Sequence, residues 1–254
     1  MEMVTFNITD KTLKQLKKFI SGWDVANELL YLYTDERNNL YLVLFDNNHI
    51  YISYLKLGVT DEFTGTYELN QSYIEGENDP KALKKFISKQ KELKLDSSND
   101  NLIWIGNDFK DFYSSKYGCD LNLDLISFCN RSNKELYLKK QDLKVLELYK
   151  NDLSCIYFKE GRIEFKFYGD DYNVFAKHII CDNYNNQLET HCHISNRYLL
   201  QTLRKFNSKD KIIIRLDERE PLIIESEDYT GIIAPRIIFE EAYGSTDGIF
   251  DTLQ

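Results

Sequence analysis

The chain has 254 residues, 43% of them apolar and 14% aromatic, with a formal net charge of −9. This composition argues against disorder and suffices for one large domain or two of roughly half the length each. No apolar run approaches the ~18–20 residues of a membrane span, and the N-terminus lacks the basic and apolar stretches of a signal peptide. Five cysteines without framework spacing predict reduced thiols, so we expect a cytoplasmic location, in a bacterial or phage-infected cell.

Four short amphipathic segments with lysine or arginine on the polar face recur along the chain. They are Asp10–Ile20, Asp79–Lys91, Lys139–Lys150 and Ser195–Lys209, and their starts lie 69, 60 and 56 residues apart. Together they carry 17 basic and 4 acidic residues, so the rest of the chain sums to −22. Positive charge that is concentrated on regularly spaced helices, against the net charge, is expected to face a polyanion.

Each basic segment is predicted to be a helix flanked by strands. In the first, Asp10 or Thr9 can cap the N-terminus, and Leu13, Leu16 and Ile20 form one apolar stripe. The strand-like runs are Val4–Ile8, Glu28–Thr34, Leu40–Phe45, Ile50–Leu57, Tyr67–Leu69, Ser72–Ile74, Leu93–Leu95, Leu102–Ile105, Phe109–Ser114, Glu135–Leu138, Leu153–Phe158, Arg162–Tyr168, Val174–Cys181, Glu189–Ile194, Lys211–Leu216, Leu222–Ser226 and Gly231–Ile238.

The order of these elements predicts four strand–helix–strand–strand–strand units, an α+β fold. The units pair into two similar domains. We expect an N-terminal domain over residues 1–121, a connector over 122–133, a C-terminal domain over 134–239 and an acidic tail over 240–254.

The last unit contains four segments whose order resembles that of DNA sliding clamps. They are Arg197–Phe206, Lys211–Leu216, Glu220–Glu225 and Gly231–Arg236. Their Tyr-Leu, Pro-Leu and Ala-Pro-basic order is similar to proliferating cell nuclear antigen, and the leucine-rich helix is similar to the bacterial polymerase III beta clamp. In the first unit, Asp46–Ile50 is similar to the Asp-Ser-Ser-His-Val turn of the eukaryotic clamp.

The resemblance implies the DNA-clamp fold, with helices lining the interior of a ring and sheets outside. It implies a non-enzymatic, cofactor-free processivity factor that encircles duplex DNA at the replication fork without reading sequence. Two domains per chain imply a homotrimer, because the ring needs six. The expected edge strands of the protomer lie near Phe109–Lys116 and Val174–Asp182.

Two sets of site residues follow. The polar faces of the helices assign DNA binding to Lys11, Lys14, Lys18, Lys81, Lys84, Lys85, Lys89, Lys140, Lys144, Arg197, Arg204 and Lys205. The resemblance places a partner groove, for short peptides of a DNA polymerase and a clamp loader, at His49, Ile50, Ile126, Phe128, Pro221, Ile232, Ala234 and Pro235. Ile232 departs from the aromatic residue of the eukaryotic clamp.

Two other functions remain open at this stage. One is a clamp-fold regulator or decoy that binds replication proteins without encircling DNA. The other is a metal-dependent nucleic-acid enzyme that uses Asp170 and Asp171, although Tyr168-Gly-Asp-Asp171 is also ordinary hairpin chemistry. The cluster of His178, Cys181, His191, Cys192 and His193 is not expected to bind zinc, because alternate strand residues point to opposite faces.

Overall fold

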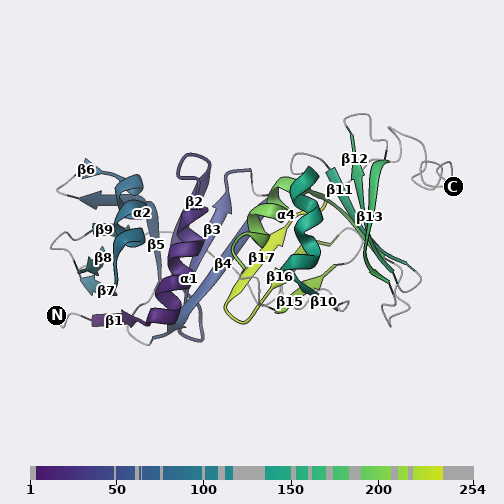
Figure 1. Cartoon of the computed structure of the whole chain (residues 1–254). Coiled ribbons are helices and arrows are strands. Elements are labelled where there is room, and N and C mark those ends of the chain that lie inside the picture. Colours follow the sequence, from purple (N-terminus) through teal and green to yellow (C-terminus); the bar gives the residue numbers. More distant parts are fainter. Residues whose placement is uncertain are drawn as a thin grey trace.

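A computed structural model describes residues 4–48, 50–60, 63, 65–74, 77–98, 101–107, 112–116, 135–149, 153–159, 162–169, 174–182, 190–206, 211–216 and 220–236. In this part of the chain, the helices lie in a row on one side and the sheets lie behind them (Figure 1). None of the described helices is both long and apolar enough to cross a membrane.

The elements repeat four times along the chain. The first repeat comprises β1 (Val4–Ile8), α1 (Asp10–Ser21), β2 (Glu28–Thr34), β3 (Asn39–Asp46) and β4 (Tyr51–Val59). The second comprises β5 (Thr66–Ile74), β6 (Glu77–Asn78), α2 (Pro80–Lys89), β7 (Leu93–Ser98), β8 (Asn101–Gly106) and β9 (Phe112–Lys116). The third comprises β10 (Glu135–Lys139), the helix η1 (Lys140–Tyr149), β11 (Leu153–Lys159), β12 (Arg162–Tyr168) and β13 (Val174–Asp182). The fourth comprises β14 (Thr190–Ser195), α4 (Asn196–Leu203), β15 (Lys211–Arg215), β16 (Leu222–Glu225) and β17 (Tyr229–Ile233).

This order confirms the predicted α+β class and its repeating unit. The predicted domain boundaries fall on residues outside the described part and stay a prediction.

One large sheet contains strands from all four repeats. Its strand order is β1-β7-β8-β9-β5-β2-β3-β4-β17-β16-β15-β10, with β6 beside β5. The antiparallel pair β4–β17 joins repeat 1 to repeat 4, with Ser53 opposite Gly231 and Ile52 opposite Ile232. A second sheet has the order β13-β12-β11-β14.

The two expected edge strands differ in outcome. β13 ends its sheet and pairs only with β12 among the described strands, as expected. The prediction for β9 is wrong, because β9 lies between β8 and β5, and Ser114 is opposite both Leu102 and Ser72. A buried hydrogen bond of 2.9 Å between the Ser72 and Ser114 hydroxyls helps to hold β5 in that place.

Local sequence signals explain the first two helices. Thr9 caps α1 by accepting a hydrogen bond of 3.2 Å from the backbone N–H of Thr12, and Asp79 caps α2 by accepting one of 2.8 Å from Ala82. Pro80 occupies the first position of α2, where its missing N–H has no intrahelical partner to lose.

The other two helices are shorter or tighter than predicted. The segment Lys140–Tyr149 is a 3₁₀ helix that follows β10 directly. The α-helix α4 ends at Leu203. At its N-terminus, Ser195 makes no side-chain cap. The runs Tyr67–Leu69 and Ser72–Ile74 belong to a single strand, β5.

The core lies between the helices and the sheets. The predicted apolar stripe of α1 is buried, as are Leu83, Phe86 and Ile87 of α2, and Phe19 and Trp23 add aromatic bulk beside them. Helix α4 approaches β17 so closely at Gly231 that a Cβ on this residue would collide with Cγ2 of Thr202. Only glycine therefore fits at this crossing, which lies on the strand that joins the two halves of the chain.

Gly231→Ala is expected to destabilise the fold by about 1–3 kcal/mol, the usual cost of overpacking a core. The measurement is the urea midpoint of unfolding. The matched variant Thr202→Ala removes the colliding methyl group, so the double substitution should recover part of the loss. Strictly additive effects of the two substitutions would contradict this account of the crossing.

Candidate functional site

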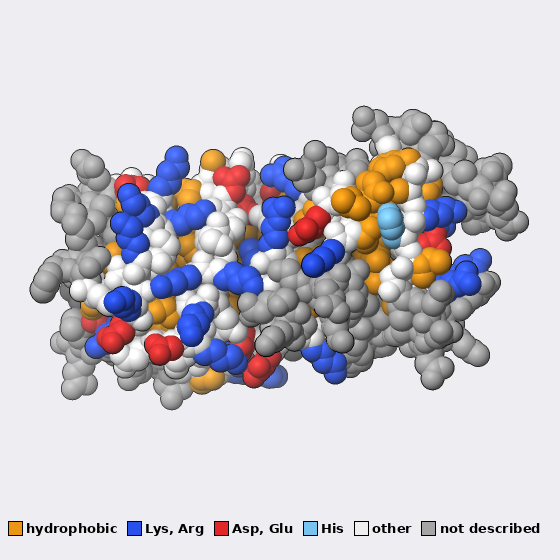
Figure 2. Space-filling view, viewed as in Figure 1, with side chains coloured by type: hydrophobic (Ala, Val, Ile, Leu, Met, Phe, Trp, Pro, Cys, Tyr) orange, Lys and Arg blue, Asp and Glu red, His pale blue; other side chains and the backbone are white. Residues whose placement is uncertain are grey.

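The basic side chains of the helices gather on the surface that faces away from the sheets (Figure 2). Each helix is held by its buried stripe, so its polar face points outward. The exposed members of the predicted DNA-binding set are Lys11, Lys14, Lys81, Lys85, Lys89, Lys144, Arg197 and Arg204. The backbone of Lys140 is in η1, but its side chain lies outside the described residues.

Two lysines of the predicted set are half-buried and tie helices of different repeats together. Nζ of Lys18 donates a hydrogen bond of 2.6 Å to the backbone oxygen of Phe206, just after α4. Nζ of Lys84 donates one of 2.6 Å to the backbone oxygen of Trp23, just after α1. Carbonyl groups near helix C-termini lack intrahelical partners, so these lysines stabilise the helix row as well as adding charge to it.

Lys11 is engaged in a surface ion pair between the halves of the chain. Its ammonium lies 3.2 Å from Asp228 and 3.5 Å from Glu227, in the turn between β16 and β17. The hydrogen bond to Asp228 is the main cause that raises the pKa of Lys11. The neighbouring Gln15 donates a hydrogen bond of 2.7 Å to the same aspartate. These contacts line a polar notch of about 570 Å³ that Lys14 and Lys211 share.

The assignment of Lys205 to the DNA-binding surface is wrong. This side chain is only 8% exposed, and Nζ donates a hydrogen bond of 3.0 Å to the Ser53 hydroxyl. The ammonium also lies 4.3 Å from the ring centre of Phe19, 5.4 Å from that of Tyr51 and 5.9 Å from that of Tyr229. The α-helix ends at Leu203, whereas the predicted segment continued to Lys209, so the turn after the helix carries Lys205 down between the rings instead of outward.

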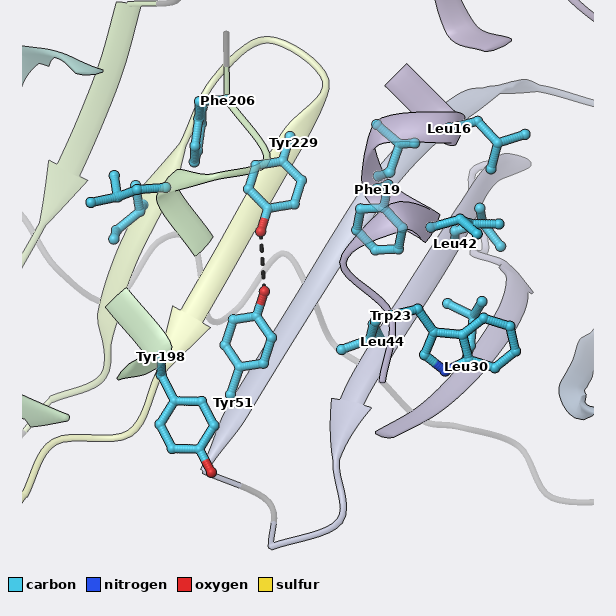
Figure 3. Close-up of a cluster of buried hydrophobic side chains, with 14 of the residues drawn as sticks. Leu16, Phe19, Trp23, Leu30, Leu42, Leu44, Tyr51, Tyr198, Phe206 and Tyr229 are labelled. Atoms are coloured by element: carbon cyan, nitrogen blue, oxygen red, sulfur yellow. Dashed lines mark hydrogen bonds between the residues drawn. The ribbon is translucent and has the colours of Figure 1, made fainter. Parts of the chain in front are cut away.

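The same aromatic cluster forms the seam between repeats 1 and 4 (Figure 3). The hydroxyl groups of Tyr51 and Tyr229 share a buried hydrogen bond of 3.2 Å, and Tyr229 packs edge-on against Phe19. Gln201 donates to the buried carboxylate of Glu28. Burial is the main cause that raises the pKa of Glu28, while the hydrogen bond from Asp24 and the charge of Lys205 act against it.

The predicted partner groove is brought together in part. Ala234 donates a backbone hydrogen bond of 2.8 Å to Ile50, and both side chains are half-buried, as are Pro221 and Pro235. His49, Ile126 and Phe128 lie outside the described residues.

Ile232 lies deeper than the groove prediction requires. It is 4% exposed and belongs to a cluster on the outer face of the central sheet. The other buried members of this cluster are Tyr31, Val43, Phe45, Tyr54 and Ile223. Ile232 therefore supports the floor of this surface rather than its rim. This cluster was not predicted from the sequence. The apolar residues at alternate positions of β2 and β3 that face away from the helices could have predicted it.

The predicted metal and catalytic alternatives gain no support. Asp170 and Asp171 lie outside the described part. Within it, no group of three or more histidine, cysteine, aspartate or glutamate side chains is placed to hold a metal ion. As strand alternation predicted, Cys192 is buried in the main core, while His191 and His193 lie on the other face of β14 with Tyr157 and Tyr168.

His193 gives the fold a pH dependence. Burial, followed by the charges of His191 and Lys166, lowers its pKa to about 4, against an ordinary value near 6.5. Between pH 4 and pH 6.5, His193 is therefore protonated in the unfolded chain and neutral in the folded chain. This contribution to stability is fully present above about pH 6.5 and is lost as the pH falls toward 4.

The expected loss over that interval is on the order of 3 kcal/mol. It is measured from urea unfolding at several pH values, with His193→Gln as the comparison. The variant should lose less stability than the wild type as the pH falls from 6.5 to 4. Parallel profiles for the two proteins would contradict the assignment.

Comparison with known proteins identifies the fold. No family model and no curated protein matches the sequence. Solved structures do match. The DNA polymerase sliding clamp of Caulobacter crescentus is 11% identical, with a TM-score of 0.66 over 93% of this chain and 66% of its own. The polymerase III beta subunit of Borrelia burgdorferi is 18% identical, with a TM-score of 0.67 over 93% of this chain and 63% of its own.

A third match, the Helicobacter pylori beta clamp bound to a DNA ligase peptide, is 12% identical, with a TM-score of 0.67 over 92% of this chain and 65% of its own. The chain thus spans about two thirds of the length of these clamps. The arrangement of repeats and sheets in this chain is the fold of a DNA sliding clamp.

Proposed function

We propose that the chain is a DNA polymerase processivity factor that encircles duplex DNA as a ring and tethers replication proteins. The observation that carries this proposal is the row of helices that presents lysine and arginine on one surface of an otherwise acidic chain. The clamp fold supports it, as does the resemblance in the last repeat. The protein acts as a scaffold, without chemistry of its own.

The charged surface suits a duplex that must slide. Duplex DNA carries one negative charge per ~1.7 Å of its axis, so a row of ammonium and guanidinium groups finds phosphates at every position. Contacts to phosphates carry no sequence information. The exposed residues Lys14, Lys81, Lys85, Lys144, Arg197 and Arg204 form the centre of the proposed contact, with Lys140 added from its sequence position. Lys11, Lys18 and Lys84 contribute less, because each already has a protein partner.

The proposed ring is a homotrimer. Two domains per chain give six in three protomers, and closed cyclic symmetry needs one repeated contact. That contact joins repeat 3 of one protomer to repeat 2 of the next. The open edge of β13 supports this, since Phe175 and Ile179 on it are each 52% exposed and an uncovered apolar edge is a liability.

A ring makes two demands that can be measured together. The wild type should sediment as a trimer at micromolar concentration, and it should stay on nicked circular DNA but run off after linearisation. Lys14→Glu with Lys85→Glu should reduce retention and lessen its salt dependence, because about one phosphate contact is lost per residue.

The matched control reverses Lys94 and Lys159, two exposed lysines on strands β7 and β11. It changes the net charge equally and should leave retention unchanged. A strictly monomeric wild type at tens of micromolar would instead favour the clamp-fold regulator that does not encircle DNA. Equal retention of both charge-reversed proteins would remove the helix surface from DNA binding.

Partner peptides are proposed to bind beside Ile50, Pro221, Ala234 and Pro235. These half-buried apolar residues lie next to the outer-face cluster, whose tyrosine and phenylalanine rings form a firm base. A short peptide with one aliphatic and one or two aromatic anchors fits such a surface.

Ala234→Arg should weaken binding of the C-terminal peptide of the cognate DNA polymerase at least tenfold, because a charge would replace a desolvated contact. Calorimetric titration measures this. Ala234 is preferable to Ile232 as the test position, since an aspartate at buried Ile232 would disturb the sheet itself. Unchanged affinity with an intact trimer would move the partner site elsewhere.

A further inference from the structure

The four helices share a pattern at one position. Counted from the first residue of each helix, the tenth residue is Phe19 in repeat 1, Lys89 in repeat 2, Tyr149 in repeat 3 and Lys205 in repeat 4. An aromatic residue thus alternates with a lysine from one repeat to the next.

Two of these four residues meet inside the chain. Repeats 1 and 4 are adjacent through β4 and β17, and Nζ of Lys205 lies 4.3 Å from the ring centre of Phe19. A cation at this distance from a ring face is within the range of a cation–π contact. At the seam between the halves of the chain, the lysine of repeat 4 therefore contacts the aromatic ring of repeat 1.

The other two residues are separated within the protomer. Lys89 is exposed at the end of α2, toward one end of the molecule, while repeat 3 is at the opposite end (Figure 1). Tyr149 is half-buried at the end of η1, and its ring lies 4.3 Å from that of Phe167 and 5.6 Å from that of His178. Its hydroxyl is 3.3 Å from Nε2 of His178, so the ring is held in place.

We infer that Lys89 of one protomer lies over Tyr149 of the partner subunit and closes the contact between protomers as Lys205 closes the internal seam. This inference rests on the proposed ring, in which repeat 2 of one chain adjoins repeat 3 of the next. It moves Lys89 from the phosphate-contacting surface to the protomer interface.

The surroundings of Tyr149 fit a contact with a second copy. At the ninth helix position, Lys18 makes a polar bond to Phe206 in the internal seam, whereas repeat 3 has Leu148, which is 72% exposed. Phe175, 52% exposed, packs edge-on against Tyr149 at 5.4 Å. Leu148 and Phe175 therefore surround one cation-accepting ring with exposed apolar side chains, which a second copy of the chain would cover.

The test measures the dissociation constant of the trimer by sedimentation equilibrium. Lys89→Ala and Tyr149→Ala should each raise this dissociation constant about tenfold per interface. The dissociation constant of the double variant should be no higher than the higher of the two single-variant values, because both substitutions remove the same contact. Tyr149→Phe and Lys89→Arg should keep most of the affinity, because the ring and the cation remain. The control Lys94→Ala removes an exposed lysine on β7 and should have no effect.

The outcomes separate this inference from the proposed function. If the wild type is a trimer and Lys89→Ala dissociates like Lys94→Ala, the ring stands and the contact is wrong. Additive effects of the two alanine substitutions would also overturn the pairing. If the wild type never assembles, the ring and this contact fall together.

Discussion

The ladder between β4 and β17 is the constraint on which the rest of the molecule depends. It makes one continuous sheet from repeats that begin far apart in the sequence, and it sets which helices are neighbours. Backbone pairing alone would permit slippage of the two halves along each other. The side chains above the ladder prevent this, because Thr202 fits over Gly231 and Lys205 fits between the rings of Phe19 and Tyr51.

Burying a lysine in that seam is costly unless the charge finds compensation. Here Ser53 accepts a hydrogen bond from it, three rings offer their faces, and the Glu28 carboxylate is near enough to affect the balance of charge. Such a site has a strict geometry, so it specifies one alignment of the two halves more strongly than apolar packing would. Two other lysines, Lys18 and Lys84, bridge the ends of neighbouring helices in the row.

Much of this architecture was predictable from the sequence, because each repeat satisfies its local rules. Thr9 and Asp79 cap their helices, and the stripes of Leu13 and Leu83 point inward as periodicity requires. The exposure of Lys85 and Arg204 follows from the same periodicity. The repeat count and the order of the elements predicted the α+β class, and the resemblance of the last repeat to sliding clamps implied the clamp fold.

The errors arose where tertiary contacts override local pattern. Lys205 continues a basic helix face in the sequence, but α4 stops at Leu203 and the following turn buries it. Ile232 was expected to line the partner groove, but the β4–β17 ladder places it in the middle of a wide sheet, where it is buried. The strand β9 was expected at an edge, but β5 bends to cover it. In each case the deciding partner is at least 40 residues away, beyond any local sequence signal.

The two kinds of seam in the proposed ring face different physical demands. The internal seam forms as part of folding. Lys205 and Glu28 can therefore be buried there, because neither is left without its partners in the folded chain. A seam between protomers must first exist as two separate surfaces in water, where a buried charge without its network would be expensive. Leaving Leu148, Phe175 and Ile179 exposed in the free chain costs little free energy, and covering them in the assembly is favourable. A lysine that stays hydrated until it reaches a ring is the cation best suited to join such surfaces, because its flexible stem lets it desolvate last.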